Sequence, residues 1–543
     1  MFEYLTTQLT ARLEQLGWPT NQLQLARPKK AENGDWSSNI AMALARELKR
    51  APMQIAEELM DGFTLDPSIV EKFEILNPGF INFFQSSDYL TAQISNILKE
   101  SGEYGKSDFG SGQTAQVEFV SANPTGPLTV GHGRQTVLGD TLANILTWSG
   151  YDVTREYYFN NAGRQMRLLG ESLKARYLEL KGESISLPDG GYEGAYLIDV
   201  AKTLLKEQPE LSATDDVDIF KSYAEKSIFS IIKGTLQRIG VVHDVFYNER
   251  SLYEAGKIDE VLDILREKGL LYDKDGATWF KTSELGIEQD RVLVKSSGEP
   301  TYRLPDIAYH REKVARGFDL VVDIFGADHI DAYPDVLSAL KVMGLKHEHI
   351  EVVIHQFVTL LRSGEVVKMS TRKANFVTLD KLIDEVGADV VRYFYIMRSA
   401  SSHLNFDLDL AKRQTEENPV FYLQYAHARI SSIFRRAVER GLDSNTENAD
   451  LTLLNEEFTV ALINKTLEFP EVIDHCRRAL EVHHLPGYLF ELATALHKFY
   501  TEYKVIDLDK PELSKARLAL LEAVQITLRN GLRILGISAP EQM

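Results

Sequence analysis

The chain has 543 residues, of which 44% are apolar and 26% charged, with a formal net charge of −19. This composition is typical of a globular protein of about three or four domains, and no apolar run reaches the length of about 18 residues that spans a membrane. The acidic balance argues against indiscriminate nucleic-acid binding, because its field repels phosphates, yet it still permits docking of one specific folded RNA. The amino terminus lacks the basic start and cleavage site of a secretion signal, and the single cysteine cannot form an internal disulfide. We therefore expect a cytoplasmic protein without membrane association.

Residues 1–110 are predicted to form a separate α+β domain. Apolar residues recur at helical spacing from Phe2 to Leu16, and Gly17 then interrupts the pattern. Two further helices are predicted, from Ile40 to Leu48 and from Pro52 to Met60.

The segment between the first two predicted helices carries Arg27 and Lys29 together with Trp36 and Asn39. One interpretation is an ordinary turn followed by a helix cap. The other is a set of cations with one exposed aromatic side chain, which would contact an RNA backbone and a splayed base. The residues alone favour the first interpretation.

The stretch Q-V-E-F-V-S-A-N-P-T-G-P-L-T-V-G-H-G-R-Q-T-V-L-G-D, from Gln116 to Asp140, predicts a strand, a loop rich in Pro and Gly, and a helix. The helix is expected to end at Gly150, in a left-handed conformation, before a second strand from Tyr151 to Phe159. The segment is therefore a β-loop-α-β unit. In such units the helix begins beside the carboxyl ends of parallel strands, where its free amides attract anions.

His132 lies at the predicted start of this helix, between Gly131 and Gly133. The glycines would let a phosphate approach the backbone, and the imidazole can donate a hydrogen bond to phosphoryl oxygens as charge develops on them. Taken by itself, the tripeptide fits a plain helix-start turn about equally well.

The chain from about residue 165 to 290 is predicted to be an insertion. Lys202 to Gly240 is expected to be helical with a charged, solvated face, and L-Y-D-K-D-G-A-T-W-F has the Asp-Gly turn of a hairpin. A further strand leads to T-Y-R-L-P-D-I-A-Y-H, where Pro305 fits the first turn of a helix. Tyr302 then lies just before the helix and Asp306 just inside it.

The run F-D-L-V-V-D-I-F-G-A-D-H predicts a buried strand that ends at Gly326 and presents Asp328 and His329 at its carboxyl edge. The later run K-M-S-T-R-K begins at Lys368. It fits either an exposed basic turn or a loop that closes on the pyrophosphate leaving group of ATP. From Asp380 the chain is predicted to be helical to its end.

These motifs together resemble one family. Thr129-Val130-Gly131-His132 is similar to the (H/T)-x-G-H element of class I aminoacyl-tRNA synthetases, and the run from Lys368 is similar to their K-M-S-K-S loop. The wider S-A-N-P-T-G-P-L-T-V-G-H-G-R, the T-Y-x-x-x-D-I-A-Y-H element and N-P-G-F-I-N-F-F at Asn77 to Phe84 resemble arginyl-tRNA synthetases, over nearly the whole chain.

The resemblance implies a fold of three parts. These are an α/β Rossmann-like nucleotide-binding catalytic domain at residues 111–405, an N-terminal α+β domain at residues 1–110 that contacts the D-loop corner of tRNA, and a C-terminal all-α anticodon-binding bundle at residues 406–543. It also implies that the chain activates arginine with ATP and Mg²⁺ to arginyl-adenylate, which then esterifies the terminal adenosine of tRNA-Arg. We expect a monomer. No dedicated protein metal site is expected, because the pairs His347/His349 and His483/His484 are predicted to be ordinary surface residues.

The resemblance also assigns roles to individual residues. The predicted catalytic residues are Thr129, Gly131, His132, Lys368, Ser370 and Arg372. The predicted ATP-binding residues are Pro124, Gly131, His132, Gly133, Gly326, Asp328, Lys368, Met369 and Ser370. The predicted arginine-binding residues are Glu118, Ser121, Asn123, Glu249, Tyr302, Asp306 and His329. The predicted tRNA-binding residues are Arg27, Lys29, Trp36, Asn39, Tyr422, Tyr425, Arg429 and Arg436, with Arg435 beside them.

A guanidinium is a planar fork of donors, which a carboxylate with a second acceptor nearby distinguishes from a lysine ammonium. Asp306, with the hydroxyl of Tyr302, is the first candidate for this recognition. Glu249 and Glu118 are candidates for the substrate ammonium or for the rest of the fork.

Two positions depart from the family pattern. Thr129 replaces the first histidine of H-x-G-H, and Thr371 replaces the second lysine of K-M-S-K; the lysine that some members carry upstream is also missing, near Gly126. Losing one donor to the transition state lowers a rate by about 100- to 1,000-fold. Two alternatives therefore stay open: a weak or silent paralogue that binds tRNA or arginine as a regulator, and a small-molecule adenylyltransferase.

Overall fold

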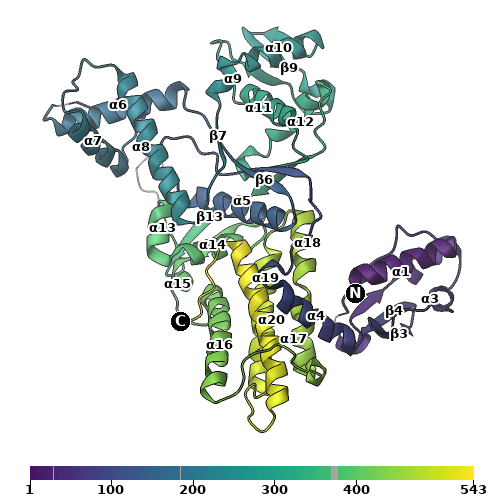
Figure 1. Cartoon of the computed structure of the whole chain (residues 1–543). Helices are drawn as coiled ribbons and strands as arrows, with labels where there is room; N and C mark the ends of the chain where they lie inside the picture. Colours follow the sequence, from purple (N-terminus) through teal and green to yellow (C-terminus); the bar gives the residue numbers. More distant parts are fainter. Residues whose placement is uncertain (29, 184, 368–376) are drawn as a thin grey trace.

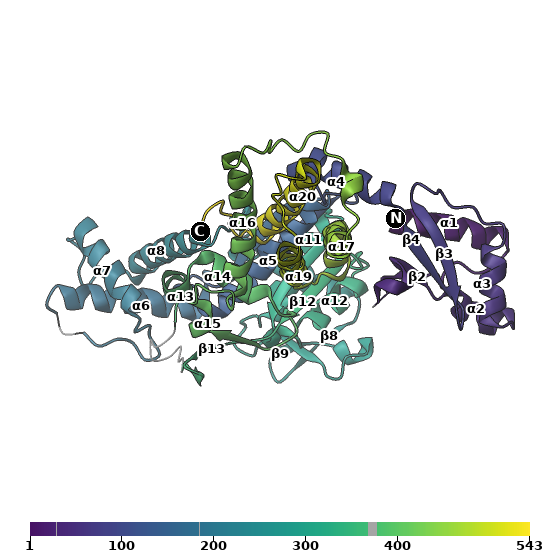
Figure 2. The ribbon, with the colours of Figure 1, turned by 90° about the horizontal axis from the view of Figure 1, so that it is seen from below.

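The computed structural model describes residues 1–28, 30–183, 185–367 and 377–543. A central parallel sheet carries the helix that follows its first strand, and two groups of elements extend from the carboxyl side of the sheet (Figure 1). A bundle of long helices lies on the opposite side, and the N-terminal domain is set to one side of that bundle in both views (Figures 1 and 2). Among the described residues, no helix combines the length and apolar character needed to traverse a bilayer.

The N-terminal domain packs helices against an antiparallel sheet, as the sequence predicts for its helices. Leu5, Leu9 and Leu13 of the first helix are fully buried in the core of this domain. The helices are α1 (Phe2–Gln15), α2 (Ile40–Leu48) and α3 (Pro52–Met60), and the strands, in spatial order, are β1 (Leu25–Ala26), β2 (Trp36–Ser38), β4 (Phe80–Gln85) and β3 (Val70–Leu76).

The central sheet confirms the predicted β-loop-α-β unit. The helix α5 (Val130–Trp148) follows β5 and is followed by Gly150, which has a φ of 92°. All strand pairs in the sheet are parallel; the chain winds from β5 through β6 to β7 on one side and later crosses back to β11 and β12 on the other side of β5. This switch point opens a crevice at the carboxyl ends of the strands. In spatial order they are β12 (Ile350–His355), β11 (Leu320–Gly326), β5 (Thr114–Glu118), β6 (Asp152–Phe159) and β7 (Val245–Asn248).

The first part of the insertion consists of α6 (Gly163–Leu180), α7 (Ala195–Glu207) and α8 (Val217–Arg238). The prediction of a helix running from Lys202 to Gly240 is therefore wrong. The chain leaves α7 just before Pro209, which lacks the amide that a continuing helix needs. Asp216 then starts α8, where its side chain accepts a hydrogen bond from the Asp218 amide.

The second part of the insertion contains the predicted hairpin and leads into the helix that carries Asp306. Strands β8 and β9 pair across Asp275-Gly276, and β10 extends the sheet on the other side of β9. The elements of this part are α9 (Arg250–Glu254), α10 (Lys257–Glu267), β8 (Leu271–Lys274) and β9 (Ala277–Phe280), and they are followed by β10 (Arg291–Val294), α11 (Arg303–Arg316) and α12 (Tyr333–Val342).

A small sheet lies between the catalytic core and the bundle, and it corrects the prediction that the chain is helical from Asp380 onward. Strand β15 (Leu404–Asp407) pairs in parallel with β13 (Val358–Arg362), which also forms a hairpin with β14 (Glu365–Val366). The run Leu404 to Asp407 alternates buried and exposed side chains, but four residues are too few to reveal that period beside strong helical patterns. Two helices precede this strand: α13 (Leu379–Val386) and α14 (Ala388–Ile396).

The C-terminal bundle shares its core with the catalytic domain, since one cluster of buried residues runs from the central sheet into the long helices. The helix α4 (Ser87–Glu100) lies within the residues expected to form the N-terminal domain but packs against α17 and α20 of the bundle. The bundle elements are α15 (Leu408–Ala411), α16 (Pro419–Glu439), α17 (Glu457–Leu467), α18 (Phe469–Ala479), α19 (His484–Glu502) and α20 (Pro511–Leu535).

Candidate active site

A cavity of about 670 Å³ lies at the carboxyl edge of the central sheet. Each of the five strands contributes to its wall at or just beyond its carboxyl end: Glu118 at the end of β5, Tyr158 on β6 with Asn160 just after it, Glu249 after β7, Gly326 on β11 and His355 on β12. The starts of α5 and α11 complete the wall, so segments almost 200 residues apart in the sequence meet around one space.

The start of α5 is held by a reciprocal pair of hydrogen bonds between Thr129 and His132. The Thr129 side chain accepts from the His132 amide, and the Thr129 amide donates to Nδ1 of His132 over 3.1 Å. Burial lowers the pKa of His132, which favours the neutral ring. Because Nδ1 accepts a hydrogen bond, the proton of the neutral ring resides on Nε2. His132 therefore offers an N–H donor at the wall of the cavity, as phosphate binding requires.

The two glycines around His132 differ in their surroundings. A Cβ added to Gly131 would meet only the Thr129 hydroxyl, at 3.6 Å, so the backbone there is open to a ligand. A Cβ on Gly133 would lie 2.8 Å from both Leu379 and Tyr395, and its amide already donates to the Thr129 carbonyl. This glycine allows α5 to pack closely against α13 and α14, and its assignment to ATP stays a prediction.

The wall of the cavity also includes an acidic recess formed by Glu118, Glu249 and Asp306, whose charges act on one another. The Tyr158 hydroxyl and the Asn160 side-chain amide each donate to a different oxygen of Glu249, over 2.7 Å. Burial raises the pKa of Glu249, and it raises the pKa of Asp306 to about 7, assisted by the charges of Glu118 and Glu249. A positive charge placed beside Asp306 and Glu249 would stabilise their ionised forms, so the recess is suited to a cationic ligand.

Glu118 differs from the other two acids because it already has a cationic partner. Lys313 is fully buried and donates to both Glu118 and Asp323, while His310 lies 3.0 Å from the other oxygen of Asp323. Although burial opposes its charge, Asp323 and Glu118 raise the pKa of Lys313. Glu118 also accepts from the Ser121 hydroxyl over 2.8 Å. Glu118 is therefore paired with a cation of the protein, whereas Asp306 and Glu249 form no ion pair with any described residue.

The structure brings most of the residues predicted to bind ATP or arginine into this one cavity. Neither Pro124, which is buried, nor Gly133 belongs to its described wall. The predictions for Lys368, Met369, Ser370 and Arg372 lie outside the described residues. The predicted residues that line the cavity are Glu118, Ser121, Asn123, Thr129, Gly131, His132, Glu249, Tyr302, Asp306, Gly326, Asp328 and His329.

Sequence reasoning missed several residues that shape the site. Tyr158, Asn160 and Lys313 are described above, and only Tyr158 and Asn160 lay near a recognisable signal, the end of a predicted strand. Arg134 is a further case. Its guanidinium is fully buried beneath the cavity and donates over 2.8 Å to the carbonyls of Gln356, Ser399 and Ser402. It fixes the loop after β12 to the first turns of α5, a contact that spacing along the chain does not reveal.

Two of the N-terminal residues predicted to contact RNA instead make contacts within the protein. Trp36 is only 5% exposed, so the expectation of an exposed aromatic side chain is wrong. The Arg27 guanidinium lies 4.6 Å from the centre of the Trp36 ring and 3.3 Å from Glu471 on α18. Arg27 and Trp36 therefore help to dock this domain on the bundle. Asn39 is exposed just before α2, and the prediction for Lys29 lies outside the described residues.

The predicted RNA contacts in the bundle separate into two groups. Tyr422 is buried, with its ring against Phe490 and His497, so it is a packing residue and not an exposed one. The remaining predicted contacts of the bundle surround a hollow of about 360 Å³: Tyr425, Arg429, Arg435 and Arg436. In this hollow Arg429 donates a hydrogen bond to the Tyr425 hydroxyl over 2.6 Å. The described side chains of this hollow include Tyr425, Arg429, Arg435, Arg436 and Tyr500.

Comparison with known protein families covers each part of the chain. The model of the arginyl tRNA synthetase N terminal domain matches residues 3–85. The model of the class I (R) tRNA synthetase catalytic domain matches residues 93–392, and the model of the DALR anticodon binding domain matches residues 423–543.

Full-length relatives and solved structures agree with these matches. The chain is 49% identical to an arginine–tRNA ligase of Salinibacter ruber, with 100% of each chain covered, and 51% identical to one of Desulfotalea psychrophila, with 95% of this chain and 94% of the relative covered. Among solved structures, the Thermus thermophilus arginyl-tRNA synthetase superposes with a TM-score of 0.78 at 23% identity, covering 99% of both chains. That of Plasmodium falciparum gives 0.75 at 19% identity, covering 100% of this chain and 99% of that one; both likenesses concern the fold alone. With family models across the sequence and relatives of about half-identical sequence over its whole length, the chain belongs to the arginyl-tRNA synthetase family.

Proposed function

We propose that the chain is an ATP-dependent arginine–tRNA ligase that forms arginyl-adenylate, with AMP released when arginine passes to tRNA-Arg. The observation that carries this proposal is the single cavity that is lined both by the donor-rich start of α5 and by the acids Asp306 and Glu249. A triphosphate fits the first side and a guanidinium the second.

In this mechanism the chain supplies position and charge, since no covalent enzyme intermediate is needed. Nε2 of His132 and the open backbone at Gly131 hold phosphate oxygens, while Asp306 and Glu249 orient the guanidinium and ammonium of arginine. The carboxylate of arginine then attacks the α-phosphorus in line and pyrophosphate leaves. ATP would arrive as its Mg²⁺ complex, and stabilisation of developing charge by the donors at the start of α5 supplies the rate increase.

The proposal extends to partners and domains. The hollow with Tyr425, Arg429, Arg435 and Arg436 supports contact with the anticodon part of tRNA, because cations and aromatic rings are interleaved there. We keep the division at residues 1–110, 111–405 and 406–543, a monomeric state and a cytoplasmic location as parts of this proposal.

The test is ATP–pyrophosphate exchange with arginine, measured on the full chain with and without tRNA-Arg. Exchange above background, together with formation of arginyl-tRNA, supports the ligase. Binding of tRNA or arginine by a folded sample without exchange would favour a regulatory paralogue, the alternative left open by Thr129 and Thr371. Transfer of the AMP group of ATP to a small acceptor, with release of pyrophosphate and without transfer of arginine to tRNA, would favour an adenylyltransferase.

A further inference from the structure

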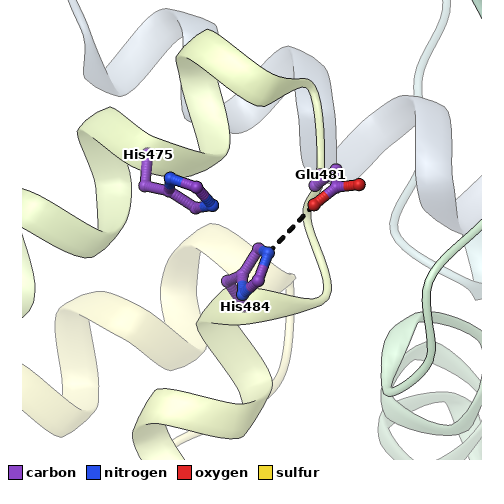
Figure 3. Close-up of side chains that lie close together, drawn as sticks. All are labelled: His475, Glu481 and His484. Carbon is purple, nitrogen blue, oxygen red and sulfur yellow. Dashed lines mark hydrogen bonds and ion pairs between the residues drawn. The ribbon is translucent and has the colours of Figure 1, made fainter.

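A second group of ligand-type side chains lies in the bundle, far along the chain from the residues of the active site. His475 near the end of α18, Glu481 in the following turn and His484 at the start of α19 each offer one ligand atom, and these atoms all lie within 4.8 Å of one another. Figure 3 shows the two imidazoles and the carboxylate facing a common space. His475 and Glu481 are exposed and His484 is half-buried, so the group is accessible from solvent.

The backbone turn between the two helices creates this group. The helix α18 ends at Leu480, which adopts a left-handed conformation with a φ of 55°. This conformation is unfavourable for a residue with a branched side chain and reverses the chain within a few residues. As a result Glu481 lies 3.0 Å from Nε2 of His484, and the rings of His475 and His484 have centroids 4.5 Å apart. The sequence predicted a plain surface pair at His483 and His484, and it gave no indication that His475 is a neighbour.

The chemistry of the group matches one class of ligand. Two imidazoles and one carboxylate form a donor set that binds Zn²⁺ and related transition ions, with water completing a tetrahedral site. Ligand atoms about 2.0–2.2 Å from a zinc ion lie roughly 3.3–3.5 Å apart, so a small change of side-chain rotamers would close the site.

Neighbouring groups do not oppose a cation. Arg477 and Arg478, on the same helix as His475, are both paired with Asp474, which offsets their charge. Cys476, the neighbour of His475 in the chain, is buried and is not part of the ligand group.

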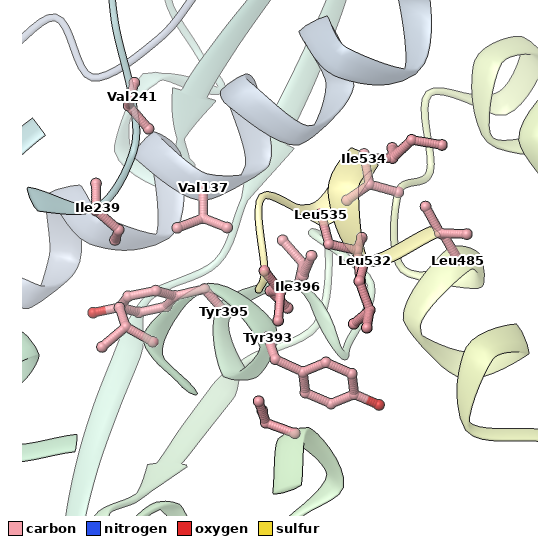
Figure 4. Close-up of a cluster of buried hydrophobic side chains, with 14 of the residues drawn as sticks. Val137, Ile239, Val241, Tyr393, Tyr395, Ile396, Leu485, Leu532, Ile534 and Leu535 are labelled. Carbon is pink, nitrogen blue, oxygen red and sulfur yellow. The ribbon is translucent and has the colours of Figure 1, made fainter. Parts of the chain in front are cut away.

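We propose that His475, Glu481 and His484 form a binding site for one Zn²⁺ or a related divalent transition ion, which ties the end of α18 to the start of α19. An ion at this position would stabilise the turn between two helices that pack against the rest of the molecule. Leu485, the next residue of α19, packs in the cluster that joins the bundle to Tyr393 of α14 and Leu532 of α20 (Figure 4). The Tyr393 hydroxyl also donates to the carbonyl of Pro486 over 3.3 Å.

The test is a titration of the full chain, without a tag and stripped of metal, with ZnCl₂ alone; isothermal titration calorimetry measures the binding. The expected result is one ion per chain, with affinity weakened at least about tenfold by each of His475→Asn and His484→Asn. A matched control is His347→Asn, a half-buried histidine elsewhere, which should leave the affinity unchanged.

Two further measurements separate a true site from incidental binding. The melting temperature of the wild type should rise with added Zn²⁺, and that of His475→Asn should not. Since these histidines are at the surface, circular dichroism should show both variants folded; Glu481→Gln supplies an independent variant. Zinc affinity in His475→Asn, His484→Asn and Glu481→Gln equal to that of the wild type, or binding of Zn²⁺ without saturation near one equivalent, would overturn the proposal. Arginine-dependent pyrophosphate exchange by the same samples reports separately on the proposed function.

Discussion

Asp306 shows how a single carboxyl group can be prepared for a cationic ligand. It lies in the first turn of α11 with the acids Glu249 and Glu118 nearby, and burial raises its pKa to about 7. The protonated form is therefore substantially populated near neutral pH until a cation enters. A guanidinium bound beside Asp306 would restore the charge and release that proton.

We predict that arginine affinity falls as pH falls through about 7. Binding requires the ionised form of Asp306, so the dissociation constant should be about tenfold weaker near pH 6 than near pH 8, with the raised pKa of Glu249 acting in the same direction. The same raised pKa lowers the free energy of unfolding as pH rises from 3.8, the ordinary value, to about 7, because the folded chain then binds more protons than the unfolded chain.

The measurement is calorimetric titration of arginine across that pH range, with Asp306→Asn as the comparison. The variant should bind weakly and should lose most of the pH dependence. A wild-type affinity that is flat between pH 6 and pH 8 would contradict the assignment of Asp306 as the guanidinium acceptor.

Helix α5 connects the phosphate side of the cavity to the rest of the fold. Its first turn is fixed from within by the Thr129–His132 pair and from outside by Arg134, which holds the loop after β12. The Tyr395 hydroxyl donates to the Val130 carbonyl over 2.8 Å, so α14 also positions this turn. The rigidity of the start of α5 therefore comes from its caps and neighbours, which hold His132 before any ligand arrives.

We predict that Thr129→Ala loosens this first turn, while Thr129→Ser does not. Loss of a side-chain cap weakens a helix start by about 1 kcal/mol, which corresponds to about fivefold faster amide exchange at that turn. Hydrogen exchange followed by mass spectrometry on peptides from the start of α5 measures this effect directly. The rate of pyrophosphate exchange should fall in Thr129→Ala and persist in Thr129→Ser; equal protection of both variants would show that the cap is not needed.

The N-terminal domain is docked on the bundle through polar contacts as well as through the chain itself. Arg27 bridges Trp36 and Glu471, and Asn464 of α17 donates to Asp35 and accepts from the side chain of Gln85. Ion pairs of this exposure contribute at most about 1 kcal/mol each, so the contact is adjustable and not rigid. This arrangement suits a domain that changes its position when a large partner binds.

We predict that Glu471→Arg releases this domain and that Arg27→Glu combined with Glu471→Arg restores the contact. The single change places like charges against each other, whereas the swap recreates an opposite pair. Limited proteolysis between the domains and the radius of gyration from small-angle X-ray scattering measure the release. Glu502→Arg, at an exposed position of α19, is the control and should leave both unchanged; release in the double variant equal to that in the single one would exclude the pair as a docking contact.

The amino-acid sequence alone was sufficient for the family, for the β-loop-α-β unit around His132 and for the position of Asp306 at the start of its helix. These features depend on short-range periodicity, on turn residues and on motifs in which the chemistry is carried by neighbours in the chain. Most of the residues predicted to bind ATP or arginine therefore line one cavity.

Only the tertiary structure decided which of those side chains are free to act. It neutralises Glu118 with Lys313, covers Trp36 and Tyr422, turns Gly133 into a packing contact, inserts β15 beside β13 and brings His475 to Glu481 and His484. Most of these outcomes depend on residues that are distant in the sequence, and each depends on a competition between burial and solvation that local pattern does not encode.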